Sequence, residues 1–304
     1  MRATVAAIHR DTPAERPRRR GVLLAAALLA ALAVALGAAV AAPAAPASAA
    51  VSAAKPDKPT KPGGGGGGSS ELAFAAVGDS FAAGVGAGSY LDTSCYRSSK
   101  SYPKLIDADA NRKLVSFPAC SGASTVETLA QVATISTTAK LVTVTVGGND
   151  VGFSDVMRDC FVLVSNSCQS RIDAGAAIAT SQDFRDDVAA VIAAIRNRTE
   201  PDAKIVVTGY PLLFHENSSG VNPKYTWADE VNDETAVLNG VIQSVAESNG
   251  AVFVDVMDDF AGHGIGSTTP WINDWSWLNT VAGFHPNATG YVAYANAIRA
   301  VPVP

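Results

Sequence analysis

From residue 72 onward, short apolar segments recur along the chain, and each is nearly continuous in its apolar character instead of alternating with polar residues. Many of their residues are β-branched, which is typical of strands buried on both faces of a parallel sheet. The five segments cover residues 72–78, 114–119, 141–148, 204–211 and 251–257. The pattern therefore predicts about five strands in one buried sheet.

Segments with the period of an α-helix lie between the later strands and after the last one. Residues 183–198 and 229–248 each carry an apolar stripe at helical spacing. A third helix is expected from about Pro286. Strands that alternate with helices predict an α/β fold, built as a three-layer α/β/α sandwich around a parallel sheet of about five strands. The stripe residues are Val188, Ile192 and Ile195 in the first helix and Val237, Val241 and Val245 in the second.

The N-terminal part of the chain does not share this alternation. Residues 1–20 contain six Arg, residues 22–42 are predominantly apolar, and residues 45–50 are small. A basic segment, an apolar segment and a small-residue site in this order are typical of a signal peptide. We therefore predict that residues 1–49 form a signal peptide that is cleaved after Ala49 and that the protein is secreted.

Two alternatives to a cleaved secretory signal stay open. The 21 residues from Val22 to Ala42 are long enough to span a bilayer as an uncleaved anchor, although most of them are Ala. The sequence RRRGVLL also leaves twin-arginine export open beside the general secretory route.

Residues 50–70 are rich in Pro and then contain six consecutive Gly. Such a segment cannot bury apolar surface, so we interpret it as a linker. Residues 71–304 are long enough for one domain with one core. They contain 14 Lys and Arg against 25 Asp and Glu, a formal net charge of −11. This acidic balance argues against nucleic-acid binding, which depends on basic side chains that neutralise phosphates.

All four cysteines lie in the predicted domain, at Cys95, Cys120, Cys160 and Cys168. An even number in an exported chain favours two disulfides, for which three pairings exist. The shortest loops favour the pairs Cys95–Cys120 and Cys160–Cys168. A zinc site is the alternative, but the sequence contains no C-x₂-C pair. We expect neither a metal nor a cofactor.

Polar turns that contain Gly follow the first three predicted strands. Ser80 follows the first strand, Gly122 lies in CSGAS after the second, and Asn149 lies in GGND after the third. Since ligands bind beyond the carboxyl ends of parallel strands, these turns are expected to meet at one edge of the sheet. A Ser nucleophile needs a nearby base, and Pro286 would hold His285 in an extended conformation at a helix entrance.

The same turns offer hydrogen-bond donors for an oxyanion. The candidates are the backbone N–H groups of Ser80 and Gly122 and the side-chain amide of Asn149. Each turn taken alone has an ordinary structural explanation, because Gly-Asp, Ser-Gly and Asn-Asp are common turn dipeptides. Two other functions are also weighed: a non-catalytic surface-binding or carbohydrate-binding module, and a flavodoxin-like cofactor binder. The second lacks a phosphate-binding G-x-x-x-x-G-K-[ST] motif, and Asp79 would repel phosphate.

The four motifs together resemble those of the SGNH hydrolases, also called GDSL esterases and lipases. Ser80 in GDSFAAG, Gly122 in ACSGAST, Asn149 in VGGND and His285 in FHPNATGY occur in the family's order, and secreted bacterial GDSL lipases are the most similar members. The resemblance implies a flavodoxin-like sheet with strand order 2-1-3-4-5. It also implies metal-free hydrolysis of esters through an acyl-enzyme, with Ser80 and His285 as the catalytic pair. The G-x-S-x-G motif of α/β-hydrolases is absent.

The sequence departs from the family pattern at two places. Many members carry an acidic residue three positions before the His, where this chain has Ala282. We expect a main-chain carbonyl of Ala282–Gly283 to orient the imidazole instead, with Asp274 as the alternative. Close relatives often have a third disulfide between two loops that contain no Cys here, so these loops are expected to be looser.

The sequence defines the substrate less closely than it defines the type of reaction. Trp271, Trp275 and Trp277 precede His285 and are interpreted either as core packing or as an apolar wall for an acyl chain, with Tyr90 a further candidate. Stacking on sugar rings would instead favour a carbohydrate acetylesterase. We expect a small-molecule or lipid ester as substrate and a monomeric protein, and a lipid substrate would bring it to a lipid–water interface.

Overall fold

The computed structural model describes residues 71–303, so the predicted signal peptide and linker lie outside the described residues. Five strands form one parallel sheet in the order β2-β1-β3-β4-β5. Both the predicted α/β sandwich and its flavodoxin-like strand order are thereby confirmed. The strands are β1 (Leu72–Gly78), β2 (Arg112–Ser116), β3 (Leu141–Thr145), β4 (Lys204–Thr208) and β5 (Val252–Val254).

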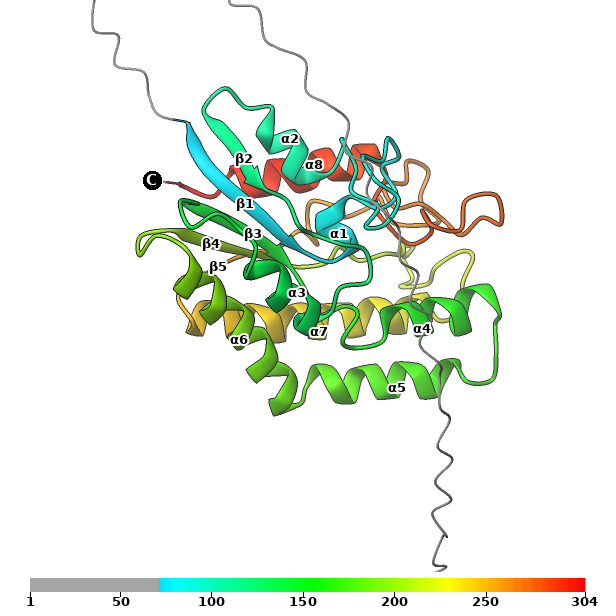
Figure 1. Cartoon of the computed structure of the whole chain (residues 1–304). Coiled ribbons are helices and arrows are strands. Elements are labelled where there is room, and N and C mark those ends of the chain that lie inside the picture. Colours follow the sequence, from blue (N-terminus) through cyan, green and yellow to red (C-terminus); the bar gives the residue numbers. More distant parts are fainter. Residues whose placement is uncertain (1–70, 304) are drawn as a thin grey trace, which may run out of the picture. The chain divides into compact units, whose positions relative to one another are not determined.

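Helices cover both faces of the sheet. Figure 1 shows α2 and α8 on one face and α3, α6 and α7 on the other, while α5 packs against α7 and α6. Within residues 71–303, no helix combines the length and the apolar character needed to cross a membrane. The helices are α1 (Ser80–Ala83), α2 (Tyr102–Asp107), α3 (Thr125–Val132), α4 (Phe153–Met157), the π-helix η1 (Arg158–Val162), α5 (Cys168–Ala179), α6 (Gln182–Arg198), α7 (Ala228–Ser248) and α8 (Ala288–Arg299).

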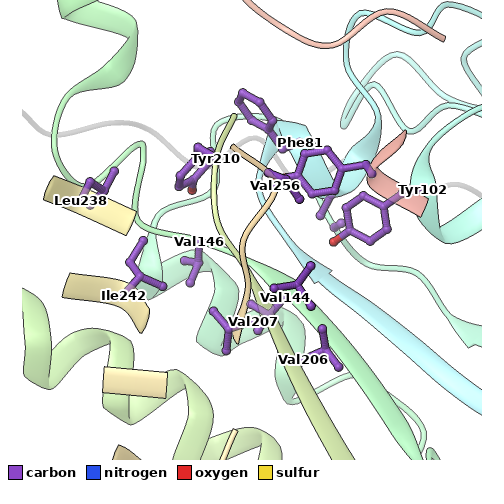
Figure 2. Packing of buried hydrophobic residues seen from close by; sticks show 14 of the residues in the cluster. Phe81, Tyr102, Val144, Val146, Val206, Val207, Tyr210, Leu238, Ile242 and Val256 are labelled. Carbon is purple, nitrogen blue, oxygen red and sulfur yellow. The ribbon is translucent and has the colours of Figure 1, made fainter. Parts of the chain in front are cut away.

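The apolar stripe predicted for α6 is buried against the sheet, but the one predicted for α7 is partly wrong. Val237 is 43% exposed, whereas Leu238 and Ile242 are buried. Figure 2 shows Leu238 and Ile242 facing the strands near Val146. The face toward the sheet has the i, i+3, i+4, i+7 spacing and consists of positions 238, 241, 242 and 245. Position 237 is turned about 100° from position 238 and lies at the side of this face.

Several predicted boundaries also differ from the structure, and the second to fifth strands each end three residues earlier than expected. β2 begins at Arg112, two residues earlier than expected, and its side chains alternate in burial because it is the edge strand of the sheet. The last helix begins at Ala288 and not at Pro286. Asn287 caps it, since its side-chain oxygen accepts hydrogen bonds from the N–H groups of Thr289 and Gly290.

The structure pairs all four cysteines. One disulfide joins Cys95 to Cys120 and the other joins Cys160 to Cys168, which are the pairs with the shortest loops. The first clamps the turn after β2 to the loop after α1, and the second joins η1 to the start of α5. Their sulfur atoms are therefore used in covalent bonds and not as metal ligands.

Candidate active site

The turn after β1 presents Ser80 at the carboxyl edge of the sheet. β1 ends at Gly78, whose φ of +122° favours glycine and whose added Cβ would lie 2.1 Å from the carbonyl oxygen of Thr145. Asp79 then caps α1, since its carboxylate accepts a hydrogen bond of 2.9 Å from the N–H of Phe81. Ser80 is the first residue of the helix. The strand, the Gly and the cap together fix the direction of the Ser80 side chain.

His285 meets Ser80 at hydrogen-bond distance although 205 positions separate them in the sequence. Its Nε2 lies 2.8 Å from the Ser80 Oγ, and its Nδ1 lies 2.8 Å from the carbonyl oxygen of Gly283. A carbonyl only accepts hydrogen bonds, so Nδ1 carries the proton and donates it there. The Nε2 lone pair is then free to accept the proton of the Ser80 hydroxyl, which is the tautomer that a general base needs.

Apolar groups surround the imidazole. The ring centroids of Phe81 and Phe153 lie 5.3 and 5.9 Å from that of His285. Desolvation of the imidazolium lowers the pKa of His285 from 6.5 to about 4, although the hydrogen bond to Gly283 opposes this shift. The imidazole is therefore neutral, in the form of a base, at neutral pH.

Asp274, the alternative orienting acid, is engaged elsewhere. Its carboxylate pairs with Lys224 and accepts a hydrogen bond of 2.7 Å from the Tyr225 hydroxyl. Among the described residues, the His285 ring has two hydrogen-bond partners, Ser80 and the Gly283 carbonyl. The expected carbonyl is thus in the orienting position.

The turn after β2 brings Gly122 to the same edge. Gly122 has a φ of +83°, while its added Cβ would meet no atom within 4 Å. Glycine is therefore favoured here by its backbone conformation and not by lack of space. The N–H of Cys120 donates to the carbonyl of Gly78, which joins this turn to the end of β1. Among residues 71–303, the backbone N–H groups of Gly122 and Ser80 make no hydrogen bond and are free to donate.

Asn149 is tied to the turn that contains Gly122. Its Nδ2 donates a hydrogen bond of 2.9 Å to the carbonyl of Ala123, which leaves its second N–H for another acceptor. The neighbouring Asp150 carboxylate accepts hydrogen bonds from the N–H and hydroxyl of Thr125. The structure thus brings Ser80, Gly122, Asn149 and His285 onto connected turns.

A buried network beneath these turns was not predicted from the sequence. The Tyr210 hydroxyl donates to the Asp79 carboxylate at 2.5 Å and accepts from the Gly148 N–H at 2.9 Å. Burial raises the pKa of Asp79 to about 7, although its hydrogen bonds with Tyr210 and Phe81 oppose that shift. Burial also raises the pKa of Tyr210 well above 10. The sequence placed Tyr210 within the fourth predicted strand, and only the structure, in which β4 ends at Thr208, shows it in the segment beyond the strand.

An apolar pocket lies beside Ser80 and His285, between α4, α5 and α7. Phe81 and Phe153, which contact the His285 ring, belong to its wall. Small residues of α5 leave space on the opposite side. Further lining residues are Val151, Val156, Met157, Ile172, Gly175, Ala176, Ala179, Tyr210 and Leu238.

The three tryptophans do not line this pocket. Trp271 stacks on His263 at 3.7 Å, and Trp275 lies parallel to Phe284 at 6.3 Å. Trp277 is 75% exposed. The Tyr90 hydroxyl accepts a hydrogen bond from the Gly86 N–H. Much of the apolar wall comes from α4 and α5, and sequence reasoning missed these residues because the two segments were not predicted as helices.

Comparison with known proteins agrees with this geometry. Residues 76–293 match the model of the GDSL-like Lipase/Acylhydrolase family. Lipase 1 of Streptomyces coelicolor is 36% identical over 225 residues, which cover 71% of this chain and 81% of the relative.

Two solved structures are similar over most of the described chain. The extracellular lipase of Streptomyces rimosus superposes with a TM-score of 0.70 at 34% identity, covering 76% of this chain and 100% of that one. Phospholipase A1 of Streptomyces albidoflavus gives a TM-score of 0.68 at 32% identity, covering 76% and 99%. With the motifs, the sheet topology and these relatives in agreement, the chain belongs to the GDSL-like lipase/acylhydrolase family of carboxylic ester hydrolases.

Proposed function

We propose that the protein is a secreted lipase or esterase in which Ser80 is the nucleophile and His285 the general base, acting on lipid or related acyl esters. The observation that carries this proposal is the hydrogen-bonded series from the Gly283 carbonyl through His285 to the Ser80 hydroxyl. It supplies a nucleophile, a base in the correct tautomer and a group that orients the base.

In the first half of the reaction, the Ser80 Oγ attacks the ester carbonyl carbon while His285 Nε2 takes the hydroxyl proton. The carbonyl oxygen becomes an oxyanion. It would be held by the N–H groups of Ser80 and Gly122 and by the free N–H of Asn149. When the tetrahedral intermediate collapses, the bond to the alcohol oxygen breaks, and the imidazolium gives its proton to the leaving alcohol. An acyl group then remains on Ser80.

The second half repeats these steps with water. His285 removes a proton from the water as its oxygen attacks the acyl carbon, and the same donors hold the new oxyanion. Collapse breaks the bond to the Ser80 Oγ, which takes back the proton from His285. The products are a carboxylic acid and the free enzyme.

The pocket beside His285 supports a substrate with an apolar acyl chain. Its walls are mostly aliphatic and aromatic, and it borders Phe81 and Phe153 at the catalytic pair. An acyl chain gains free energy when it leaves water for such walls. An acetyl group would leave most of the pocket unused, so the pocket favours lipid esters over carbohydrate acetates.

Two further observations bear on where the enzyme works. The paired cysteines are typical of proteins in oxidising compartments. The extracellular lipase of S. rimosus is among the similar structures. Together with the predicted signal peptide, they support secretion, and we propose that the domain acts as a monomer.

The proposed function is tested with p-nitrophenyl esters of two to sixteen carbons and residues 71–304, wild type beside Ser80→Ala. We expect Ser80→Ala to abolish hydrolysis of every ester, because no other group can form the acyl-enzyme. Full activity in this variant would exclude Ser80 as the nucleophile. A wild-type optimum at the acetyl ester would favour the acetylesterase alternative.

Asn149→Ala removes one proposed oxyanion donor. We expect kcat to fall about 10²–10³-fold, which is the usual loss for one such donor. The melting temperature should fall by only a few degrees, because the variant also loses the hydrogen bond to the Ala123 carbonyl. Steady-state kinetics and thermal unfolding measure both quantities. A variant that retains more than half of the wild-type kcat would remove Asn149 from the oxyanion site.

Asp274→Asn distinguishes the carbonyl from a distant acid as the orienting group. Loss of a carboxylate that fixes the tautomer of a catalytic His costs about 10⁴-fold in kcat. We expect less than about a tenfold loss here, because Asp274 binds Lys224 and Tyr225 instead of His285. The acidic limb of kcat/KM should stay near pH 4 in both proteins, since the lowered pKa of His285 keeps the base neutral down to that pH. A loss near 10⁴-fold would show that Asp274 acts on His285.

Ala176→Phe tests whether the pocket holds the acyl chain. Ala176 lines the pocket, and Ala174 on the same helix is exposed, so Ala174→Phe is the matched control. We expect Ala176→Phe to lower kcat/KM for the longest esters at least about tenfold, because the Phe side chain would fill space that the distal methylene groups of the acyl chain need. Short esters should be hydrolysed at the wild-type rate. An equal effect of both substitutions, or none, would place the acyl chain elsewhere. Thermal unfolding controls for overpacking.

A further inference from the structure

Several large apolar side chains are exposed on loops that follow the carboxyl ends of the strands. They lie in the segment after η1, in the loop between β4 and α7, and in the loop between β5 and α8. Figure 1 shows these loops on the side of the domain toward which the strands run. We call the following residues the rim patch: Leu163, Val164, Val221, Trp277 and Leu278.

The three loops are joined by a cluster of aromatic rings. Phe161, in the last turn of η1 before the first loop, lies 5.2 Å from the ring of Tyr225 in the second loop and 5.7 Å from the ring of Phe284 in the third. Phe284 stacks on Trp275, and Trp275 meets Trp277 edge to face at 5.5 Å. One connected series of aromatic rings therefore links the three loops that carry the patch, and it includes Trp277 of the patch and Phe284, the residue before His285.

Trp277 and Leu278 are the most exposed residues of the patch. A tight turn presents them, in which the Ser276 hydroxyl accepts from the Leu278 N–H and the Ser276 carbonyl accepts from the Asn279 N–H. Trp277 is 75% exposed and Leu278 is 99% exposed. A side chain as exposed as Leu278 packs against almost nothing, so the fold does not account for an apolar residue there.

The charges around the patch indicate which surface it fits. Lys224 is paired with Asp274, and Arg158 is paired with Asp155 and Asp159. Residues 71–304 carry a formal net charge of −11. An anionic lipid surface would repel such a domain, whereas an electrically neutral surface would not.

We propose that the rim patch docks the enzyme on an electrically neutral lipid–water interface, with Trp277 and Leu278 entering the boundary between headgroups and acyl chains. This inference rests on the proposed ester hydrolysis. Docking would bring the site to the acyl esters of a lipid aggregate. Trp and Leu suit this role, since the indole favours the headgroup level and the Leu side chain the acyl layer. Docking there turns the loop that carries His285 toward the lipid.

The test measures cosedimentation with phosphatidylcholine vesicles in the Ser80→Ala background, which leaves the lipid intact. We expect the combined substitutions Trp277→Ser and Leu278→Ser to lower the vesicle partition coefficient at least about tenfold. The matched control combines Val237→Ser and Val292→Ser, which remove exposed apolar residues of α7 and α8 outside the patch. It should bind as the parent does. Leu278→Ser alone should lower binding to a smaller degree without changing the melting temperature.

Soluble p-nitrophenyl acetate separates this inference from the proposed function. With Ser80 restored, the Trp277→Ser, Leu278→Ser protein should hydrolyse this ester at the wild-type rate and hydrolyse vesicle lipid more slowly. Inactivity of the wild type on soluble esters would count against the proposed function alone, because vesicle binding is read without catalysis.

Three results would overturn the proposed docking. One is equal vesicle binding by the patch variant and its parent. Another is binding only to vesicles of anionic phosphatidylglycerol. The third is sedimentation as a dimer that the patch substitutions disrupt, without vesicle binding, which would make the patch an interface between two copies of this chain.

Discussion

The buried hydrogen bond between Tyr210 and Asp79 holds the ends of three strands in one arrangement. Asp79 belongs to the turn after β1, Gly148 to the turn after β3, and Tyr210 to the segment after β4. Because Asp79 also caps α1, the same carboxyl group fixes the first turn of the helix that carries Ser80. A buried polar group is costly unless it is satisfied, so these partners constrain one another. The spacing between Ser80 and the proposed oxyanion donors depends on this constraint.

A main-chain carbonyl has a different effect on His285, the proposed base, than a carboxylate would have. It fixes the tautomer and the ring direction, yet it brings no charge that stabilises the imidazolium. The site thereby avoids the cost of burying a further carboxylate next to Phe81 and Phe153. The lowered pKa of His285 follows from the same apolar surroundings. The weaker base must therefore rely more on the oxyanion donors during the reaction.

The sequence carried enough information for the sheet and for the residues proposed as catalytic, because both depend on short-range signals. Apolar runs mark buried strands, and polar Gly-containing turns mark their carboxyl ends. Contacts between segments that lie far apart in the sequence were harder to predict than the strands and their turns. Tyr210 has no local motif that reveals its bond to Asp79, and the face of α7 was misjudged by one residue at Val237. α8 begins at Ala288 and not at Pro286, because the side chain of Asn287 caps the helix and sets its boundary.

The Cys95–Cys120 disulfide links the assembly of the oxyanion turn to the redox state of the surroundings. The bond clamps the turn that contains Gly122, and the Cys95 carbonyl also accepts a hydrogen bond from the Ser121 N–H. In a reducing cytoplasm this clamp would stay open, and the loop of 25 residues would keep its conformational freedom. The export proposed above would thus let the turn that contains Gly122 reach its fixed conformation only outside the cell, where the disulfide can form.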